Sequence, residues 1–322
     1  MKNNSTLLID TSIGSNNLGD FIIMDAINEN INFLKNSSLF RISSHQPTGK
    51  TGKRLLKSCD KKFLCGSNLL GFYYLKRNQM NIGVFDLIFK KKLILLGVGW
   101  RQEDIKINLL NRFKIKNLLS KEDLHSVRDN FTKIKLNKLG FNNVINTSCP
   151  TTWGLTKEHT DKINYKKSKK VLFTFTDYNK DKKKDRELLN ILKKNYDEIF
   201  FWAQGLNDLN YFNSFDKRIT ENVNVIGSNL KDFNDFLYTH DVDYIGTRLH
   251  AGIRALQLKK RTIIVSIDNR TEYLGEDINL RFIKRANIEE LEILIHDESK
   301  IEIRIPTKEI EEWKKYYLQE YK

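Results

Sequence analysis

Short apolar segments alternate with segments of helical spacing along most of this 322-residue chain. The apolar segments lie at 6–10, 62–65, 93–98, 126–128, 144–147, 170–174, 198–203, 223–226, 242–245 and 261–267. Strands that alternate with helices form parallel sheets, because a parallel connection has to cross over the sheet, usually through a helix. The alternation therefore predicts an α/β chain with two Rossmann-like domains that face a cleft.

The length favours two domains over one. Residues 156–170 are polar and charged, as expected of a connection between domains. We expect an N-terminal domain at 1–155, a linker at 156–170 and a C-terminal domain at 171–300. The remaining segment, 301–322, is expected to contain an amphipathic helix that can cross back onto the first domain.

Composition narrows the class of protein. The formal net charge is +15, but the sequence contains no zinc-finger, RNA-recognition or basic-zipper pattern, so we expect no nucleic-acid partner. Peripheral contact with an anionic membrane accounts better for the positive net charge. An uninterrupted apolar run of membrane-spanning length and a signal peptide are both missing, which predicts a cytoplasmic protein. The three cysteines form no metal motif, and we expect neither a metal nor a cofactor.

Residues 244–256 are predicted to form the end of a buried strand, a tight turn and the start of a helix. Arg248, Leu249 and His250 fall at this junction, where open α/β sheets bind ligands and helix N-termini attract anions. Arg254 follows His250 by four residues and shares its helix face. Arg248 could instead cap a neighbouring loop, and His250 could be a structural histidine. Their occurrence together between glycines favours a site for a phosphate or carboxylate.

Other turns follow predicted strands in the first half of the chain. Asn17 and Gly19 lie between the first strand and the first helix, and Asp20 is placed either to cap that helix or to act chemically. Two small-residue turns, containing Gly66 with Ser67 and Gly97 with Gly99, follow the next strands. We expect these turns to line a cleft.

Arg128 also leaves a strand just before a helix, next to Asp129. The two could form a local ion pair of little value. Yet Arg128 is a second arginine at a strand end, in the opposite half of the chain from Arg248. Two arginines facing one cleft suit a ligand with two anionic ends, because a guanidinium matches carboxylate and phosphate geometry.

The chain resembles the polysaccharide pyruvyl transferase family. The matching segments are Asn-Leu-Gly-Asp at 17–20, Ser-Val-Arg-Asp at 126–129, Leu-Gly at 139–140, Arg-Leu-His at 248–250 and Asp-Asn-Arg at 268–270. The resemblance covers about residues 7–280. Relatives often carry a run of glycines where this chain has Cys-Gly-Ser-Asn at 65–68, a difference that bears on the acceptor.

The resemblance implies a glycosyltransferase-B-like fold and a transferase that moves pyruvate from phosphoenolpyruvate to a pair of sugar hydroxyls. The acceptor would be a cell-surface polysaccharide or its sugar or lipid-linked precursor, and the products a ketal and phosphate. Carried over by motif, Arg128, Arg248, Leu249 and His250 would bind the donor. A histidine suits the proton transfer to the methylene carbon, so His250 is a candidate general acid or phosphate ligand. Asp20 and Asp129 are candidate bases, and Arg254 could extend the anion site.

Two alternatives remain open at this stage. A glycosyltransferase of the same fold would use a nucleotide sugar and bind its base and diphosphate in the second domain. A non-catalytic basic protein would bind membrane or polyanion through its lysine runs, with steep salt dependence and indifference to changes at Arg248 or His250.

Overall fold

The computed structural model describes residues 5–32, 34, 37–70, 92–101, 109–300 and 302–321. They divide into two compact units. The N-terminal unit comprises the described residues within 1–15, 23–153 and 305–322, and the C-terminal unit those within 16–22 and 154–304. The domain expected at 1–155 included residues 16–22, which belong to the C-terminal unit, where the backbone of residues 16–18 pairs with the 204–206 segment.

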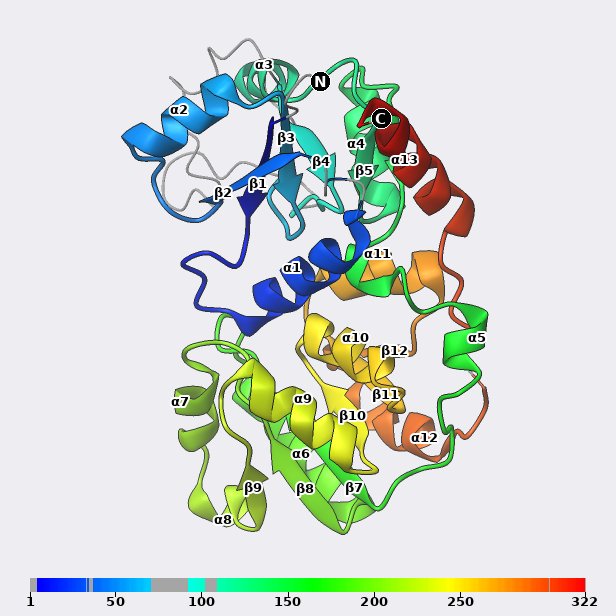
Figure 1. Cartoon of the computed structure of the whole chain (residues 1–322). Helices are drawn as coiled ribbons and strands as arrows, with labels where there is room; N and C mark the ends of the chain where they lie inside the picture. Colours follow the sequence, from blue (N-terminus) through cyan, green and yellow to red (C-terminus); the bar gives the residue numbers. More distant parts are fainter. Residues whose placement is uncertain are drawn as a thin grey trace. The chain divides into compact units, whose positions relative to one another are not determined.

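The N-terminal unit is built on parallel strands (Figure 1). The first four are β1 (Ser5–Asp10), β2 (Ser38–Ser43), β3 (Lys61–Cys65) and β4 (Ile94–Leu96), in the order β2-β1-β3-β4. Next, β5 (His125–Val127) pairs in parallel with β6 (Val144–Asn146). A bridge between Val98 and Val127 joins this pair to the end of β4. The strands thus run in the doubly wound order 2-1-3-4-5-6, with ligand positions expected at their carboxyl ends.

Helices bury both faces of these strands. One face packs against α2 (Lys50–Ser58), α3 (Leu109–Leu118) and α4 (Asn130–Lys138). The other packs against α1 (Leu18–Asn30) and α13 (Thr307–Glu320). Along β1, Leu7 and Ile9 join the first core and Leu8 joins the second. This alternation on a strand that is apolar throughout is typical of a parallel sheet covered on both sides.

The C-terminal helix α13 belongs to the N-terminal unit. It begins at Thr307, inside the segment 301–322 in which the sequence predicts a helix. Trp313 is fully buried and packs edge-on against Phe63 of β3, while its ring also lies against Trp153. The hydroxyl of Tyr317 donates a hydrogen bond of 2.8 Å to the carbonyl of Leu124. The helix therefore completes the second core of this unit.

The C-terminal unit contains one six-stranded parallel sheet. Its strands are β7 (Lys170–Thr174), β8 (Glu198–Phe201), β9 (Val223–Val225), β10 (Asp243–Gly246), β11 (Thr262–Ser266) and β12 (Phe282–Lys284). The order β12-β11-β10-β7-β8-β9 is that of a Rossmann sheet. The sequence predicts 261–267 as the last strand, but the structure adds β12 at the edge of the sheet. This strand is too short and too mixed in composition to stand out in the sequence.

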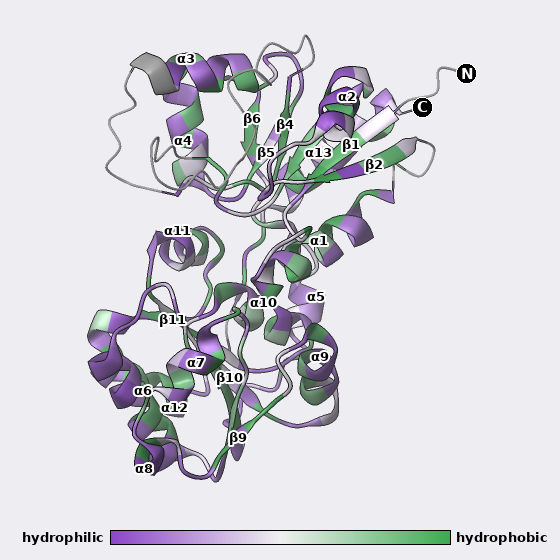
Figure 2. Ribbon diagram, turned by 90° about the vertical axis from the view of Figure 1, so that its left-hand side faces the viewer, coloured by the Kyte–Doolittle hydropathy of each residue, from purple (hydrophilic) through white to green (hydrophobic). Residues whose placement is uncertain are grey.

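Two layers of helices cover this sheet. On one face lie α6 (Lys182–Asn195), α7 (Asp208–Asn213) and α12 (Leu291–His296), and on the other α9 (Leu230–Thr239) and α10 (Leu249–Gln257). The remaining elements of this unit are α5 (Lys157–Thr160), α8 (Lys217–Thr220), α11 (Asn269–Ile278) and the 3-10 turn Arg285–Glu290, while the 3-10 turn Pro150–Thr152 belongs to the N-terminal unit. Figure 2 shows hydrophobic residues along the strands and hydrophilic residues on α6 and α8.

Candidate active site

Arg248 lies at the point where the order of the C-terminal sheet reverses. It follows β10, and β10 pairs with β7, from which the chain winds in both directions. The last residue of β10 is Gly246, which packs closely on β7: a Cβ there would lie 2.4 Å from the hydroxyl oxygen of Thr174. Arg248 then stands as the N-cap residue of α10 in an extended conformation. Sheets of this kind bind ligands at such a switch point.

Two carboxylates hold the Arg248 side chain. Its Nε donates to Oδ2 of Asp208 at 2.9 Å, and its Nη2 contacts the other oxygen of the same carboxylate. Nη2 also donates to Oδ1 of Asp177 at 2.9 Å. Asp208 is fully buried, whereas the Asp177 side chain is 21% exposed. The guanidinium is therefore fixed by an inner aspartate and met by a second one nearer to solvent.

Asp208 is held as firmly as the arginine. Its carboxylate accepts hydrogen bonds from the backbone N–H of Gly205 at 2.7 Å and of Asp177 at 2.9 Å. Burial raises the pKa of Asp208, while Arg248 and these two N–H groups act in the opposite direction. Gly205 also makes room for the arginine, since a Cβ there would lie 2.3 Å from Nη2 of Arg248.

Tyr178 and Arg270, for which no role was predicted from the sequence, extend this cluster. The ring of Tyr178 lies 5.1 Å from Cζ of Arg248 and 5.4 Å from Cζ of Arg270, and its side chain is half exposed. Asp268 caps α11 and accepts from Nε of Arg270 at 2.9 Å. Arg270 was visible in the sequence as part of the Asp-Asn-Arg turn, but Tyr178 follows β7 with no motif around it.

Leu249 and His250 form the first turn of α10 and are both 6% exposed. The hydroxyl of Tyr244 donates to the carbonyl of Arg248 at 2.9 Å and so fixes the start of this helix. Arg254 lies one turn further along α10 and is partly buried. The structure thus brings Arg248, Leu249 and His250 to one helix end, with Arg254 following on the same helix.

The turn with Asn17, Gly19 and Asp20 lies in the C-terminal unit, beside the loop that follows β8. Oδ1 of Asn17 accepts from Nε2 of Gln204 at 2.7 Å. Gly19 allows this approach, because a Cβ there would lie 2.7 Å from the same Nε2. Asp20 is 6% exposed, in the first turn of α1. Gln204, which contacts Asn17, is followed in the chain by Gly205, which packs against Arg248. The turn is therefore linked to the arginine cluster through Gln204 and Gly205.

Arg128 lies in the N-terminal unit, directly after β5, and is 1% exposed. Its Nε and Nη2 donate to Oδ2 of Asp129 at 3.1 and 2.9 Å. The other oxygen of Asp129 caps α4, accepting from the backbone N–H and the hydroxyl of Thr132 at 2.8 and 2.6 Å. Asp129 is fully buried. The pair is therefore a buried and oriented one, unlike the weak surface pair that sequence alone left open.

Gly99 stands against the Arg128 guanidinium. A Cβ at Gly99 would lie 2.4 Å from Cζ of Arg128 and 2.8 Å from Oδ1 of Asn68. Asn68 follows β3, Gly99 follows β4 and Arg128 follows β5, so three neighbouring strands bring these residues together. Each of the two predicted arginines thus has a buried aspartate and a glycine without room for a side chain.

The other predicted turns serve the packing of the N-terminal unit. Gly66, Ser67 and Gly97 have φ values of 61°, 58° and 63°. A Cβ at Gly66 would lie 2.3 Å from the side chain of Ile23, and one at Gly97 would lie 2.2 Å from Pro150. Positions 66 and 97 require glycine because a Cβ would collide with these neighbours and because left-handed backbone favours glycine. Ser67 adopts the same backbone with a side chain.

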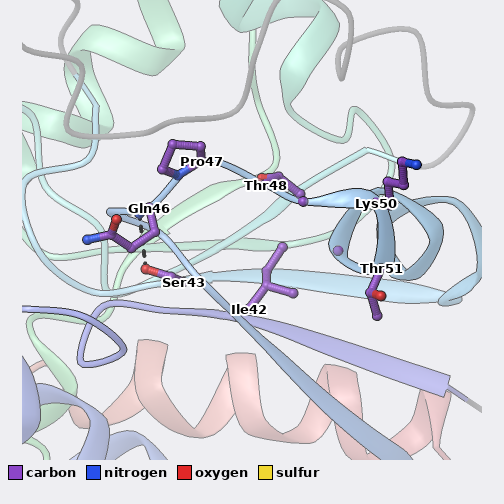
Figure 3. A pocket seen from close by; sticks show the side chains of 9 residues that line it. Ile42, Ser43, Gln46, Pro47, Thr48, Lys50 and Thr51 are labelled. Atoms are coloured by element: carbon purple, nitrogen blue, oxygen red, sulfur yellow. Dashed lines mark hydrogen bonds between the residues drawn. The ribbon is translucent and has the colours of Figure 1, made fainter.

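A cavity of about 370 Å³ lies elsewhere in the N-terminal unit, between the end of β2 and the start of α2 (Figure 3). Its lining includes Ser43, Gln46 and Lys50. Ser43 accepts from the backbone N–H of Gln46 at 3.1 Å and donates to the carbonyl of Ile13. Its polar lining is mostly exposed, and none of the residues predicted from the sequence lies in it.

Within the described ranges, no group of three or more His, Cys, Asp or Glu side chains is arranged to hold a metal ion. Cys59, Cys65 and Cys149 are buried and form no disulfide, and burial raises the pKa of Cys65 and Cys149. Over the same ranges, no helix is both long enough and apolar enough to span a membrane.

Solved structures show which fold class this architecture belongs to. MnaA of S. aureus, solved with UDP, aligns with a TM-score of 0.56 and 13% identity over 98% of this chain and 97% of its own. The UDP-GlcNAc 2-epimerase of Methanocaldococcus jannaschii, solved with UDP-GlcNAc and UDP, aligns with a TM-score of 0.55 and 12% identity over 96% and 97%. The corresponding epimerase of Rickettsia bellii gives 0.55 and 11% over 98% and 95%. The predicted fold class, glycosyltransferase-B-like with Rossmann-like units, is confirmed.

The family is narrower than the fold. The sequence profile described as "Polysaccharide pyruvyl transferase" matches residues 17–269, which is more than half of the chain. The chain therefore belongs to the polysaccharide pyruvyl transferase family and is a transferase, and the family implies a sugar or polysaccharide acceptor. No curated protein sequence matches it significantly.

Proposed function

We propose that this transferase moves pyruvate from phosphoenolpyruvate onto two hydroxyls of a sugar in a cell-surface polysaccharide or in its lipid-linked precursor. The observation that supports this proposal most is the Arg248 junction, where an oriented guanidinium and His250 stand at the start of a helix within the matched family region. Phosphoenolpyruvate carries a carboxylate and a phosphate, and guanidinium groups suit both. We assign donor binding to Arg248, Leu249 and His250, and also to Arg128, with Arg254 extending the anion site.

The proposed reaction balances without an oxidant or a metal. The methylene carbon of the donor gains a proton and becomes a methyl group, and one sugar oxygen bonds to C2. The bond between C2 and the phosphate oxygen breaks, and the second sugar oxygen closes the ketal. One hydroxyl proton replaces the proton given to the methylene carbon, and the other leaves with phosphate. His250 acts either as the acid for the first step or as a ligand of the phosphate.

The two candidate bases differ in their surroundings. Both oxygens of Asp129 already accept hydrogen bonds from Arg128 and Thr132, so its proposed role is to orient Arg128. Asp20, in the turn beside Gln204, keeps the role of candidate base for a sugar hydroxyl.

Arg248 can bind an anion only if the carboxylates that pair with it leave room for one. Asp208 is fully buried and held by backbone N–H groups, whereas Asp177 is partly exposed. We therefore propose that an anionic group of the donor takes the place of Asp177 at Nη2, while Asp208 keeps the guanidinium in position.

Calorimetric titration of phosphoenolpyruvate tests the proposal. The wild-type protein should bind it, and Arg248→Lys should bind at least about tenfold more weakly, because the bidentate geometry is lost while the charge is kept. His250→Gln should keep the affinity but lose turnover if His250 is the acid, and lose affinity if it binds phosphate. UDP and UDP-GlcNAc serve as controls. Binding of a nucleotide sugar without binding of phosphoenolpyruvate would instead favour the glycosyltransferase alternative.

The cellular setting is also part of the proposal. We infer a cytoplasmic enzyme that approaches the inner face of the membrane, because the net charge of +15 favours anionic surfaces and a lipid-linked acceptor would reside there.

A further inference from the structure

Two buried polar atoms beside Gly99 have no hydrogen-bond partner among the residues that the structure describes. They are Nη1 of Arg128 and Oδ1 of Asn68. Arg128 is 1% exposed and Asn68 is 8% exposed. Buried polar groups are almost always paired, since each unpaired group loses its hydrogen bonds to water without replacement. Two such groups at one place indicate a position that a ligand fills.

The two side chains are close together. Cζ of Arg128 and Oδ1 of Asn68 lie 2.4 and 2.8 Å from the same point, the position of a Cβ built on Gly99. The three residues follow β5, β3 and β4 at the carboxyl edge of the N-terminal sheet. Ligands of parallel α/β sheets bind at this edge. Gly99 keeps a side chain out of the space between the two groups.

The two atoms have opposite hydrogen-bonding roles. A guanidinium nitrogen only donates, and an amide oxygen only accepts. The matching ligand presents an acceptor, best an anionic oxygen, next to an O–H group. Phosphoenolpyruvate supplies the anionic oxygen but, as the trianion, has no hydroxyl. The hydroxyl must then come from the second substrate.

We infer that Asn68 binds the sugar acceptor and orients the hydroxyl that attacks the donor, through a hydrogen bond from that hydroxyl to its Oδ1. This inference rests on the proposed function. An amide takes up no proton, so Asn68 aims the oxygen lone pair at C2 while another group removes the proton. Nη1 of Arg128 meanwhile holds an anionic oxygen of the donor, and Asp129 holds Arg128. Asn68 thus becomes a residue that selects the acceptor by the position of one hydroxyl.

The test compares the wild-type protein with Asn68→Ala and with Asn142→Ala, in which an exposed asparagine of the same unit is removed. Three quantities are measured: the dissociation constant of phosphoenolpyruvate, the melting temperature, and phosphate release from phosphoenolpyruvate with methyl galactoside, methyl glucoside and methyl mannoside. Asn68→Ala should raise the KM for the accepted glycoside at least tenfold, or lower kcat similarly. Its phosphoenolpyruvate affinity should stay within twofold. Its melting temperature should equal or exceed that of the wild type, because an unpaired buried acceptor is removed.

The outcomes separate this inference from the proposed function. A tenfold loss of phosphoenolpyruvate affinity in Asn68→Ala would place Asn68 at the donor and overturn the inference. A melting temperature several degrees below that of Asn142→Ala, or unchanged glycoside kinetics, would also overturn it. If no glycoside is turned over, unchanged donor affinity and undiminished melting temperature support the inference, and any other combination overturns it. If the wild-type protein and Asn142→Ala both fail to bind phosphoenolpyruvate, the proposed function itself fails.

Discussion

Arg248 and Asp208 form a buried, two-point ion pair at the carboxyl edge of the C-terminal sheet. Nε of the arginine donates to one carboxylate oxygen at 2.9 Å, and Nη2 contacts the other. Charge-assisted pairs of this geometry are strong and directional. The aspartate is in turn fixed by the backbone N–H groups of Gly205 and Asp177. The guanidinium therefore has one orientation before any ligand arrives.

The first prediction concerns the stability that this pair controls. Arg248→Ala leaves Asp208 as a buried, uncompensated carboxylate, so the free energy of unfolding should fall by about 3–5 kcal/mol. The double variant Arg248→Met with Asp208→Leu should recover most of this loss, because neither charge remains buried. Urea unfolding followed by circular dichroism measures both. Equal stability of Arg248→Ala and the wild type would show that the pair carries no such constraint.

The second prediction separates the two aspartates of Arg248. Asp177→Asn keeps a hydrogen-bond acceptor near Nη2 but removes the negative charge that competes with an incoming anion. We expect phosphoenolpyruvate to bind about threefold to tenfold more tightly, since a partly exposed ion pair contributes on the order of 1 kcal/mol. Calorimetric titration at fixed salt measures the change. Weaker binding by Asp177→Asn would mean that Asp177 supports the bound state instead.

The third prediction uses Gly99 and Gly154 as a matched pair of glycines. A Cβ at Gly99 would overlap Cζ and Nη2 of Arg128 at 2.4 Å, whereas none of the described atoms lies within 4 Å of one at Gly154. Gly99→Ala should lower the free energy of unfolding by about 1–3 kcal/mol through overpacking. Displacement of Arg128 should also weaken phosphoenolpyruvate binding at least about tenfold, as expected when a charged hydrogen bond is lost.

Gly154→Ala should have the opposite sign in stability. Its backbone does not require a positive φ, so alanine there reduces the entropy of the unfolded chain and adds about 0.4–1 kcal/mol. Thermal and chemical unfolding of both variants provide the comparison. Similar behaviour of Gly99→Ala and Gly154→Ala would contradict the close contact between Gly99 and Arg128.

Much of the fold could be predicted from sequence because most strands of these parallel sheets are apolar throughout. The segments 6–10, 170–174 and 261–267 all contain strands of the structure, at β1, β7 and β11. By contrast, β2 was missed, since its outer position in the sheet leaves Leu39 and Phe40 exposed between polar residues and weakens the apolar signal. Helix α11 was missed as well, because its start was noted only as the Asp-Asn-Arg segment at 268–270, without a helix after it.

The candidate site could be predicted only in part. Arg128 and Arg248 were found because each follows an apolar strand and precedes a helix. The partners of Arg248 could not be predicted in this way. Asp208 and Tyr178 follow other strands and lie 40 or more residues from Arg248 in the chain. Only the strand order, which places β7 and β8 beside β10, brings these residues together. The unpaired Oδ1 of Asn68 likewise became visible only once three strand ends were placed side by side.

The last prediction concerns His125, which is fully buried on β5. Its Nδ1 accepts the backbone N–H of Leu95 at 3.0 Å, and its Nε2 lies 2.7 Å from the carbonyl of Ser120. Because Nδ1 accepts, the single proton sits on Nε2 and the ring is neutral. Burial lowers the pKa of His125 to about 4 from its ordinary value of 6.5.

This lowered pKa makes stability depend on pH in one direction. Above pH 6.5 the folded and unfolded states both hold a neutral ring, so the full stability is present. Between pH 6.5 and 4 only the unfolded state takes up a proton, and stability falls by about 1.4 kcal/mol per pH unit, or about 3 kcal/mol in total.

His125→Gln should lack this part of the slope. Leu136→Ala, which removes a buried side chain of the same unit, should lose about 2–5 kcal/mol at every pH and keep the slope. Urea unfolding of the three proteins at pH 7.5, 6, 5 and 4.5 measures this, and a wild-type slope in His125→Gln would assign the pH dependence to other groups.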